Sequence, residues 1–425
     1  MRYQVSIERN GRQTVVGFLT GNDPSDTVFA YSEAYLASKQ TAPISVSLPL
    51  QALSFSPAQT KNFFDSLLPE GFTRRTVAQW IHADEEDYLT ILHALGCECL
   101  GALQITAEDE ARKPCYEPLS LEQVKALAAE GAFKSAELVT ESHLSLAGAS
   151  GKVGLYYDGN AWYQPRGTAP STHIVKQSHV RLKHLVQNEQ LALMTAKACG
   201  LDVAESFIIN TGSGADEEIL LATRRYDRLF PKKGTAISGL SVPLRLHQED
   251  FAQALGIPAS RKYEREGDGY LRQMFSLLRR YSADPIRDMT RLWDQIVFSY
   301  LIGNTDAHIK NYALLYSADL SSLRLAPAYD LIGATVYPMA SKALSVRIGR
   351  AARIEEVTEA DFELAAREAG LGVRMAMARY RELASRFTPA LRESAETLAE
   401  EGYAEAKEIA RRILETGGIA NVDVG

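Results

Sequence analysis

The residues best suited to chemistry lie in a short polar segment, Gly303–Asn311, between two apolar runs. Within it, Asp306 and Asn311 are five residues apart, the spacing at which a kinase catalytic loop places a base and a metal-binding amide. Phosphoryl transfer needs a carboxylate to orient the attacking hydroxyl, and hard oxygen ligands for Mg²⁺. Asp330, after a second short apolar run, could supply a further oxygen ligand. The pattern indicates a phosphoryl-transfer site.

A purely structural interpretation of these residues stays open, because Asn and Asp also favour capped turns. The later Asp330 and the β-like runs beside it favour the catalytic interpretation of the spacing between Asp306 and Asn311. His308 is either a catalytic histidine or a buried residue that supports the segment. Lys310 is either a contact to the γ-phosphate or a solvated lysine.

A second group of residues could hold a phosphate through backbone N–H groups. Small side chains allow a close approach to phosphate oxygens, and a neighbouring lysine adds positive charge. The spacing is not that of a Walker A loop, because Val153 stands where Ser or Thr is required. A glycine-containing turn without a ligand is the alternative. The residues are Ala147, Gly148, Ala149, Ser150, Gly151 and Lys152.

Lys176 and Glu189 form a third candidate pair. In kinases a strand lysine holds the α- and β-phosphates and is fixed by a helix carboxylate. Lys176 ends the β-like run His173–Lys176, and Glu189 opens the helical pattern that follows. The alternatives are a surface lysine and a glutamate that complements the helix dipole.

Hydrophobic patterning predicts the elements that must position these residues. Asp158-Gly159 predicts a hairpin, since this dipeptide adopts the positive φ angles of a type I′ turn. Asn188 is expected to cap a helix over 189–199, and 106–140 to form a mostly helical connector. We expect strands at 3–7, 44–48, 153–157, 161–163, 173–176, 206–209, 218–226, 312–316 and 323–326, helices at 63–68, 74–82 and 87–95, and mostly helix beyond Gln248.

Composition excludes several classes of protein. Of the 425 residues, 46% are hydrophobic and 23% charged, which is typical of a folded protein with ample core. The formal net charge of −7 argues against a uniform basic field for nucleic acid. No apolar run reaches membrane-spanning length, and the charged N-terminus argues against a signal peptide. The four cysteines lack zinc-site spacing, so we expect reduced thiols in a cytoplasmic protein.

Taken together, the motifs resemble those of the HipA family of bacterial serine/threonine kinase toxins. The resemblance covers essentially the whole chain, and the order and spacing of the motifs carry it. The matching segments are Pro43–Leu50, Phe63–Glu70, Ser145–Ala149, Thr172–Lys176, Arg225–Arg228, Leu246–Asp250, Thr305–Asn311 and Tyr329-Asp330.

The resemblance implies an α+β, two-lobed, protein-kinase-like fold. A small β-rich lobe would carry an extra β-containing N-terminal subdomain, and the large lobe would be mainly helical. The expected divisions are the N-terminal subdomain at 1–105, a helical connector at 106–141, the small lobe with its ATP loop at 142–240 and the helical lobe with the catalytic loop at 241–425.

The resemblance also implies residue roles. Asp306 would be the catalytic base, and Asn311 and Asp330 the Mg²⁺ ligands. Ser145 matches a serine whose autophosphorylation ejects the ATP loop, with Ser142 and Ser150 as alternatives. The ATP contacts would be Ala147, Gly148, Ala149, Ser150, Gly151, Lys152, Lys176, Arg224, Arg225, Tyr226, His308, Lys310 and Asn311. The chain departs from the better-known pattern at Ser150-Gly151, which replaces Gln-Glu, and at Arg224, which replaces Glu.

Partners and substrates follow from the resemblance in the same way. It implies ATP and Mg²⁺, a HipB-like helix-turn-helix antitoxin, operator DNA bound through the complex, and an aminoacyl-tRNA synthetase, notably the glutamyl enzyme, as protein substrate. A small-molecule kinase of the aminoglycoside phosphotransferase type is a second possibility, which the N-terminal 100 residues disfavour. An inactive scaffold that binds antitoxin and DNA is a third, which the joint presence of Asp306, Asn311 and Asp330 disfavours.

Overall fold

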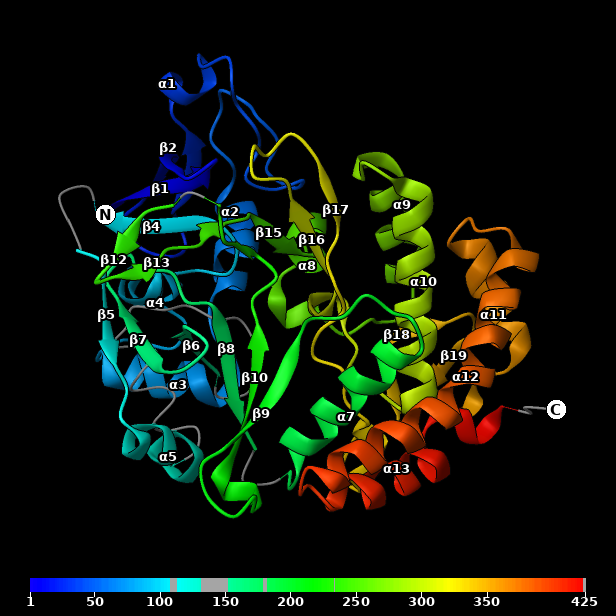
Figure 1. Cartoon of the computed structure of the whole chain (residues 1–425). Coiled ribbons are helices and arrows are strands. Elements are labelled where there is room, and N and C mark those ends of the chain that lie inside the picture. Colours follow the sequence, from blue (N-terminus) through cyan, green and yellow to red (C-terminus); the bar gives the residue numbers. More distant parts are fainter. Residues whose placement is uncertain (108–112, 131–151, 179–181, 233, 423–425) are drawn as a thin grey trace. The chain divides into compact units, whose positions relative to one another are not determined.

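The structure is a computed structural model that describes residues 1–107, 113–130, 152–178, 182–232 and 234–422 (Figure 1). The chain forms two compact units, each assembled from segments far apart in the sequence. Unit 1 comprises Met1–Val180, Ile209–Ala259 and Leu315–Ser322, and unit 2 comprises Arg181–Ile208, Ser260–Leu314 and Leu323–Gly425. Helices and strands occur in both units, as the α+β class predicts.

Unit 1 is organised around two sheets. One has the strand order β3-β2-β1-β4, and the other has the order β5-β7-β6-β8-β10-β9. The segment Met1–Val180 contains β1 (Arg2–Arg9), β2 (Arg12–Thr20), β3 (Val28–Tyr31), α1 (Glu33–Leu36), α2 (Pro57–Phe64), α3 (Gly71–Trp80), α4 (Tyr88–Leu95), β4 (Leu103–Ala107), β5 (Cys115–Pro118), α5 (Leu121–Glu130), β6 (Lys152–Tyr157), β7 (Trp162–Arg166) and β8 (His173–Gln177). The rest contains β9 (Ser206–Asn210), which begins in unit 2, and β10 (Ile219–Arg224), β11 (Arg228–Leu229), β12 (Ala236–Ile237), β13 (Leu240–Ser241), β14 (Leu244–Arg245), β15 (Gln248–Asp250) and α8 (Phe251–Leu255).

The predicted hairpin of unit 1 is confirmed, but its turn is not of type I′, because Asp158 does not adopt a positive φ. Strands β6 and β7 pair antiparallel, with Tyr156 opposite Tyr163. The turn is closed by Asp158, whose carboxylate accepts hydrogen bonds from the backbone N–H groups of Asn160 and Ala161. Gly159 adopts a φ of +101°, which explains why glycine stands there.

Three local predictions in unit 1 need correction. The segment 44–48 is a turn rather than a strand, because the hydroxyls of Ser45 and Ser47 bond within it and to other elements. The helix predicted at 63–68 begins earlier, at Pro57, because Ser56 forms a capping box with Gln59. The predicted helical connector contains strand β5, which pairs with β7.

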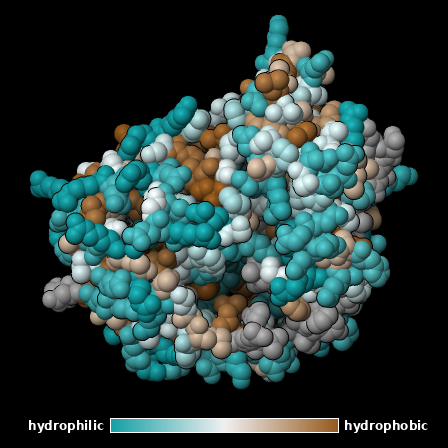
Figure 2. Space-filling model, turned by 180° about the vertical axis from the view of Figure 1, so that it is seen from behind, coloured by the Kyte–Doolittle hydropathy of each residue, from teal (hydrophilic) through white to brown (hydrophobic). Residues whose placement is uncertain are grey.

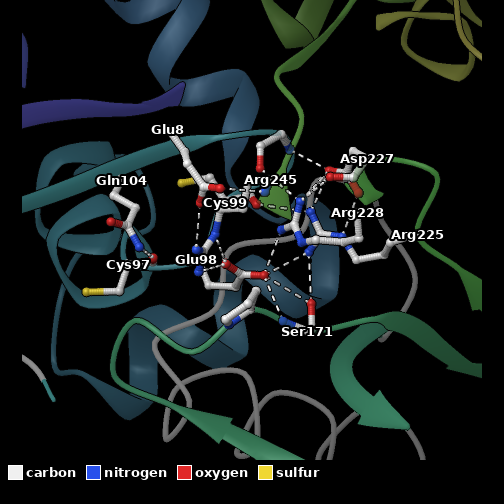
Figure 3. A network of polar contacts seen from close by, with 12 residues as sticks. Glu8, Cys97, Glu98, Cys99, Gln104, Ser171, Arg225, Asp227, Arg228 and Arg245 are labelled. Carbon is white, nitrogen blue, oxygen red and sulfur yellow. Dashed lines mark hydrogen bonds and ion pairs between the residues drawn. The ribbon is translucent and has the colours of Figure 1, made fainter. Parts of the chain in front are cut away.

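A cluster of buried charges joins distant segments of unit 1 (Figure 3). Glu98 is 1% exposed, and its carboxylate contacts three guanidinium groups. The nitrogen–oxygen distances are 2.7 Å to Arg228, 2.7 Å to Arg245 and 3.3 Å to Arg225. Both the backbone N–H and the hydroxyl of Ser171 also donate to Glu98.

Two further carboxylates balance the charge of this cluster. Asp227 accepts from Arg225 through Nε at 2.9 Å and Nη2 at 2.7 Å, and Glu8 pairs with Arg245 at 3.4 Å. Burial alone would raise the pKa of Glu98, but Arg228, Arg245 and Arg225 outweigh it and hold this pKa well below its usual value. The cluster therefore stabilises unit 1 only while its members stay ionised together.

Glu98→Gln should lower the free energy of unfolding by about 3–5 kcal/mol, because it leaves buried guanidinium groups without their shared anion. Glu117→Gln is the matched control, since Glu117 forms an exposed ion pair with Arg166 and should contribute about 1 kcal/mol or less. Urea unfolding of both variants measures the difference. Equal losses in the two variants would contradict the role of the cluster.

Glu249 is a second buried carboxylate of unit 1, with a different environment. It accepts hydrogen bonds from the hydroxyl and backbone groups of Ser45 and Val46 and from the Tyr316 hydroxyl. Burial raises the pKa of Glu249 to about 7, although these donors act in the opposite direction. The neighbouring His247 is also buried, and burial lowers its pKa to about 4.

A carboxylic acid whose pKa is raised on folding contributes stability below its unfolded pKa, and that stability is lost as the pH rises through the folded pKa. For Glu249 the loss should amount to roughly 2–3 kcal/mol between pH 5 and pH 8. The quantity to measure is the difference in unfolding free energy between the wild type and Glu249→Gln, in which the contribution of His247 cancels. A difference that does not change with pH would contradict this assignment.

Unit 2 is mainly helical. The long helices α12 and α13 lie side by side, and α10 packs against both α9 and α12 (Figure 1). The indole N–H of Trp293, a fully buried residue of α10, donates to the carbonyl of Ala376 in α12 at 3.0 Å. The elements are α7 (Leu185–Ala198), α9 (Tyr270–Tyr281), α10 (Pro285–Ile302), β16 (Ala313–Tyr316), β17 (Leu323–Leu325), β18 (Ala343–Ile348), β19 (Ala351–Arg353), α11 (Glu359–Glu368), α12 (Val373–Glu400) and α13 (Glu405–Thr416), with β16 ending in unit 1.

The predicted cap of α7 is wrong. The helix begins at Leu185, so Asn188 lies inside it and is fully buried. The amide of Asn188 donates to the carbonyl of Gly333 and accepts from its N–H at 2.8 Å. This pairing with a distant loop of unit 2 explains a polar residue within the helix.

The surface shown in Figure 2 is mostly hydrophilic, with hydrophobic residues in separate patches. Large apolar side chains that are more than half exposed include Leu53, Trp80, Leu121, Ile286 and Met339. Over the described ranges, every helix is too short or too polar to cross a bilayer.

Candidate active site

The polar segment of unit 2 begins where helix α10 ends. Gly303 stops the helix in the left-handed conformation, with a φ of +79°, and its N–H donates to the carbonyl of Tyr300. The N–H of Asn304 donates to the carbonyl of Ser299 at 2.8 Å. A Cβ atom at position 303 would lie 2.2 Å from Oγ1 of Thr335. Glycine is therefore required for the chain to leave the helix in this direction.

Strand β18 is hydrogen-bonded to the polar segment at Thr305. The carbonyl of Thr305 accepts from the hydroxyl of Ser345 at 2.6 Å and from its N–H at 3.2 Å. The hydroxyl of Thr305 donates to the carbonyl of Ser341 at 2.7 Å. These bonds fix the residue that immediately precedes Asp306.

Asp306 and Asn311 are brought together by a tight turn. The carbonyl of Asp306 accepts from the His308 N–H at 2.8 Å and from Nδ2 of Asn311 at 3.0 Å. The amide nitrogen of Asn311 is thereby engaged with the backbone of Asp306. The carboxylate of Asp306 is exposed, whereas His308 and Lys310 are each 7% exposed.

Asp330 lies beside this turn through Asn304. The amide of Asn304 donates to the carbonyl of Asp330 at 3.5 Å, and Asn304 is 4% exposed. Asp330 has a φ of +57°, an uncommon backbone conformation that often marks a functional position. A small recess nearby is lined by Asn304, Asn311 and the residues on both sides of Asp330, Tyr329 and Leu331. The structure thus brings both candidate metal ligands to one place in unit 2.

The candidate nucleotide residues belong to unit 1. Lys152 on β6 and Lys176 on β8 are direct partners in the antiparallel pairing, so their side chains share one face of the sheet. Val175 is 1% exposed and lies on the opposite face, because successive side chains of a strand point to opposite faces of the sheet. The structure thus places two of the predicted nucleotide residues side by side on one sheet.

The three residues of the segment Arg224–Tyr226, all predicted to contact ATP, differ in how their side chains are placed. Arg225 is 3% exposed and belongs to the buried charge cluster, so its side chain is committed to Glu98 and Asp227. Arg224 is exposed and ends strand β10. The hydroxyl of Tyr226 donates to Gln248. Any contribution of Arg225 to a nucleotide contact must come from its backbone.

Several predicted residues lie outside the described ranges. They are Ser142, Ser145, Ala147, Gly148, Ala149, Ser150 and Gly151. The predicted autophosphorylation site and most of the predicted ATP loop therefore stay predictions. Lys152 is the described residue at the end of that loop.

Tyr263 belongs to the site, although the sequence patterns did not indicate it. Its hydroxyl donates to Oδ1 of Asp306 at 2.9 Å, and its ring packs edge-on against His308. The two residues of the hydrogen bond are 43 positions apart. Tyr263 follows a short 3₁₀ turn in a polar, glycine-containing loop, and nothing in its local spacing relates it to Asp306.

Family models match both parts of the chain. The model of the HipA-like C-terminal domain matches residues 144–391, more than half of the sequence, and the model of the HipA N-terminal domain matches residues 11–106. The chain belongs to the HipA family of serine/threonine kinase toxins. As a member of this family, it is a kinase.

Individual HipA relatives agree with this result. The Sinorhizobium fredii protein Y4mE, named as a putative kinase, is 35% identical over 367 residues, which is 84% of each chain. The serine/threonine-protein kinase toxin HipA of Shewanella oneidensis is 28% identical over 356 residues, 81% of this chain and 78% of the toxin.

A solved structure shares the fold. It contains Shewanella oneidensis HipA with HipB and operator DNA, and its match covers 99% of this chain and 100% of that chain with a TM-score of 0.77. The sequence identity in this comparison is 22%. The HipA-like part of the fold prediction is therefore confirmed.

Gly303→Ala should displace the turn that carries Asp306, because alanine at this φ is strained and its Cβ would clash with Thr335. We expect a loss of about 1–2 kcal/mol in unfolding free energy and a lower phosphoryl-transfer rate. Gly372→Ala is the control, since Gly372 has an ordinary φ and open space around it. Equal stability of the two variants in thermal unfolding would contradict the requirement for Gly303.

Proposed function

We propose that the chain is a Mg²⁺- and ATP-dependent serine/threonine protein kinase with Asp306 as the catalytic base. The observation that carries the proposal is the turn in which Asn311 is bonded to the backbone of Asp306, with Asp330 linked to the same turn through Asn304. An exposed carboxylate beside two oxygen ligands is what phosphoryl transfer requires.

In this reaction the acceptor hydroxyl approaches the γ-phosphorus of ATP and gives its proton to the carboxylate of Asp306. A bond forms between the acceptor oxygen and the γ-phosphorus, and the bond from that phosphorus to the bridging oxygen of ADP breaks. ADP leaves with the electron pair. The protein contributes mainly by positioning, because the transferred group needs little covalent assistance.

The residues present fit a magnesium ion. The amide oxygen of Asn311 and the carboxylate of Asp330 are hard oxygen donors, the type that Mg²⁺ prefers. The bond from Nδ2 of Asn311 to the backbone of Asp306 uses the amide nitrogen, so the amide oxygen would be the metal ligand. A bound Mg²⁺ would neutralise charge on the β- and γ-phosphates. Asn304 and the backbone of Asp330 hold these donors in place.

ATP phosphates would be held by the paired lysines of unit 1. Lys152 and Lys176 are direct cross-strand partners on one face of the sheet, so both side chains could contact the same phosphate group. We assign the remaining nucleotide contacts, as the family pattern implies, to 147–151, to the backbone of Arg224–Tyr226, and to His308 and Lys310. The low exposure of His308 and Lys310 favours a supporting role for their side chains.

The biological role that we propose is that of a toxin in a toxin–antitoxin module. The Shewanella oneidensis relative is named as a toxin and has been solved with HipB and operator DNA. By analogy, this chain would bind a HipB-like helix-turn-helix antitoxin, and the complex would bind operator DNA. Its protein substrate would be a translation component such as the glutamyl-tRNA synthetase. Autophosphorylation of Ser145, with Ser142 and Ser150 as alternatives, would silence the kinase.

Asp306→Asn should reduce ATP turnover by at least a hundredfold, because the amide cannot accept the acceptor proton. The affinity for ATP should stay within about twofold of the wild type, since asparagine keeps the shape of the side chain. Steady-state turnover and calorimetric ATP binding, both with Mg²⁺, measure the two quantities. Undiminished turnover in the variant would exclude Asp306 as the base, and a parallel loss of ATP binding would indicate general damage to the site.

A further inference from the structure

The contact between Tyr263 and Asp306 lies at the solvent-facing side of the predicted catalytic turn. The hydroxyl of Tyr263 donates to Oδ1 of Asp306 at 2.9 Å. The ring centroids of Tyr263 and His308 are 5.4 Å apart, with an interplanar angle of 79°. Tyr263 is 49% exposed, and Asp306 is also exposed. The hydrogen bond between Tyr263 and Asp306 is therefore formed between two solvent-exposed residues.

The backbone next to Tyr263 is firmly anchored through Glu264. The N–H of Glu264 donates to the carbonyl of Ser345 at 2.9 Å. The carboxylate of Glu264 accepts from the N–H of Arg347 at 2.7 Å and from that of Tyr270 at 3.1 Å. The position of Tyr263 is thus set by strand β18.

The same strand also holds the turn that carries the base. Ser345 donates to the carbonyl of Thr305 through both its hydroxyl and its N–H, and Thr305 directly precedes Asp306. One residue of β18 therefore fixes the backbone on both sides of the contact between Tyr263 and Asp306. Such a shared anchor is expected where two side chains must keep a constant distance.

An exposed aspartate needs a partner of this kind to act as a base. The torsion that orients an aspartate carboxylate has a broad energy minimum, so the group rotates readily in solvent. A misplacement of about 1 Å can reduce a reaction rate about a hundredfold. A single hydrogen bond to one oxygen of Asp306 restricts this rotation.

We propose that Tyr263 is a positioning residue for phosphoryl transfer. Its hydroxyl holds Oδ1 of Asp306, and this orients Oδ2 to receive the proton of the acceptor hydroxyl. The inference rests on the proposed function of Asp306 and adds a residue that the kinase spacing does not include. We assign Tyr263 to the transfer step, because its hydroxyl donates to the carboxylate of the proposed base.

Tyr263→Phe tests this role, because phenylalanine keeps the ring on His308 and removes the hydroxyl. The probe is the phosphatase-treated full-length chain with Mg-ATP, and the readout is the single-turnover rate of its own phosphorylation at several ATP concentrations. We expect the maximal rate to fall about tenfold. The ATP concentration for half-maximal rate and the thermal unfolding temperature should both stay unchanged.

Tyr281→Phe is the matched control, since Tyr281 is a partly exposed tyrosine of α9 in the same unit. It should leave the maximal rate unchanged. A Tyr263→Phe rate equal to the wild type would overturn the inference. A higher rate would overturn it too, because it would mean that the tyrosine hydroxyl occupies the place of the acceptor. A loss accompanied by a lower unfolding temperature or weaker ATP binding would also overturn it.

The failure of this inference and that of the proposed function are distinguishable. If Asp306→Asn is inactive while Tyr263→Phe is fully active, the inference alone is wrong. If Asp306→Asn retains the wild-type rate, the proposed function is wrong, and the inference falls with it.

Discussion

An ionised carboxylate that is buried away from water must be compensated by charges and hydrogen bonds, and Glu98 is compensated by three arginines. The guanidinium groups of Arg225, Arg228 and Arg245 converge on it, while Asp227 and Glu8 balance the remaining charge. These residues come from β1, from the segment before β4 and from the chain after β10 (Figure 3). The arrangement holds the segment that follows β10 in place, and that segment is where the family pattern expects contacts to ATP.

In unit 2 the turn that carries Asp306 is held by backbone conformation and hydrogen bonds rather than by buried charges. Gly303 turns the chain out of α10, Ser345 of β18 holds the carbonyl of Thr305, and Asn311 closes the turn onto Asp306. As a result, the carboxylate of Asp306 is exposed while its backbone is fixed. This combination suits a catalytic base, which must meet a substrate without losing its orientation. The hydrogen bond from the Tyr263 hydroxyl constrains the side chain of Asp306 as well.

How far the sequence predicted the structure depends on the range of the interactions. The turn between Asp306 and Asn311 was predictable because the two residues bond to each other across five positions. The β6–β7 hairpin was also predictable, because its turn is held by hydrogen bonds between Asp158 and the residues two and three positions later. Asn188 was misjudged because its partner, Gly333, is 145 positions away, and propensity alone assigns asparagine to a helix cap.

The segment 44–48 shows the same limit. Its alternation of apolar and polar residues is typical of a strand, but Ser45 bonds to Glu249, 204 positions away, and the segment forms a turn. Tyr263 was not predicted as part of the site because its link to Asp306 depends on how β18 packs in unit 2. The family resemblance supplied the roles of Ser145 and the ATP loop, which no local physical argument could have assigned.

The central claim is that this chain transfers phosphate with Asp306 as the base. Mass spectrometry of the intact, phosphatase-treated chain after incubation with Mg-ATP tests it most directly, with wild type and Asp306→Asn measured side by side and phosphopeptides mapped. We expect one added phosphate on the wild type, located on Ser145, and none on the variant. Equal phosphorylation of both proteins, or none on either, would contradict the claim.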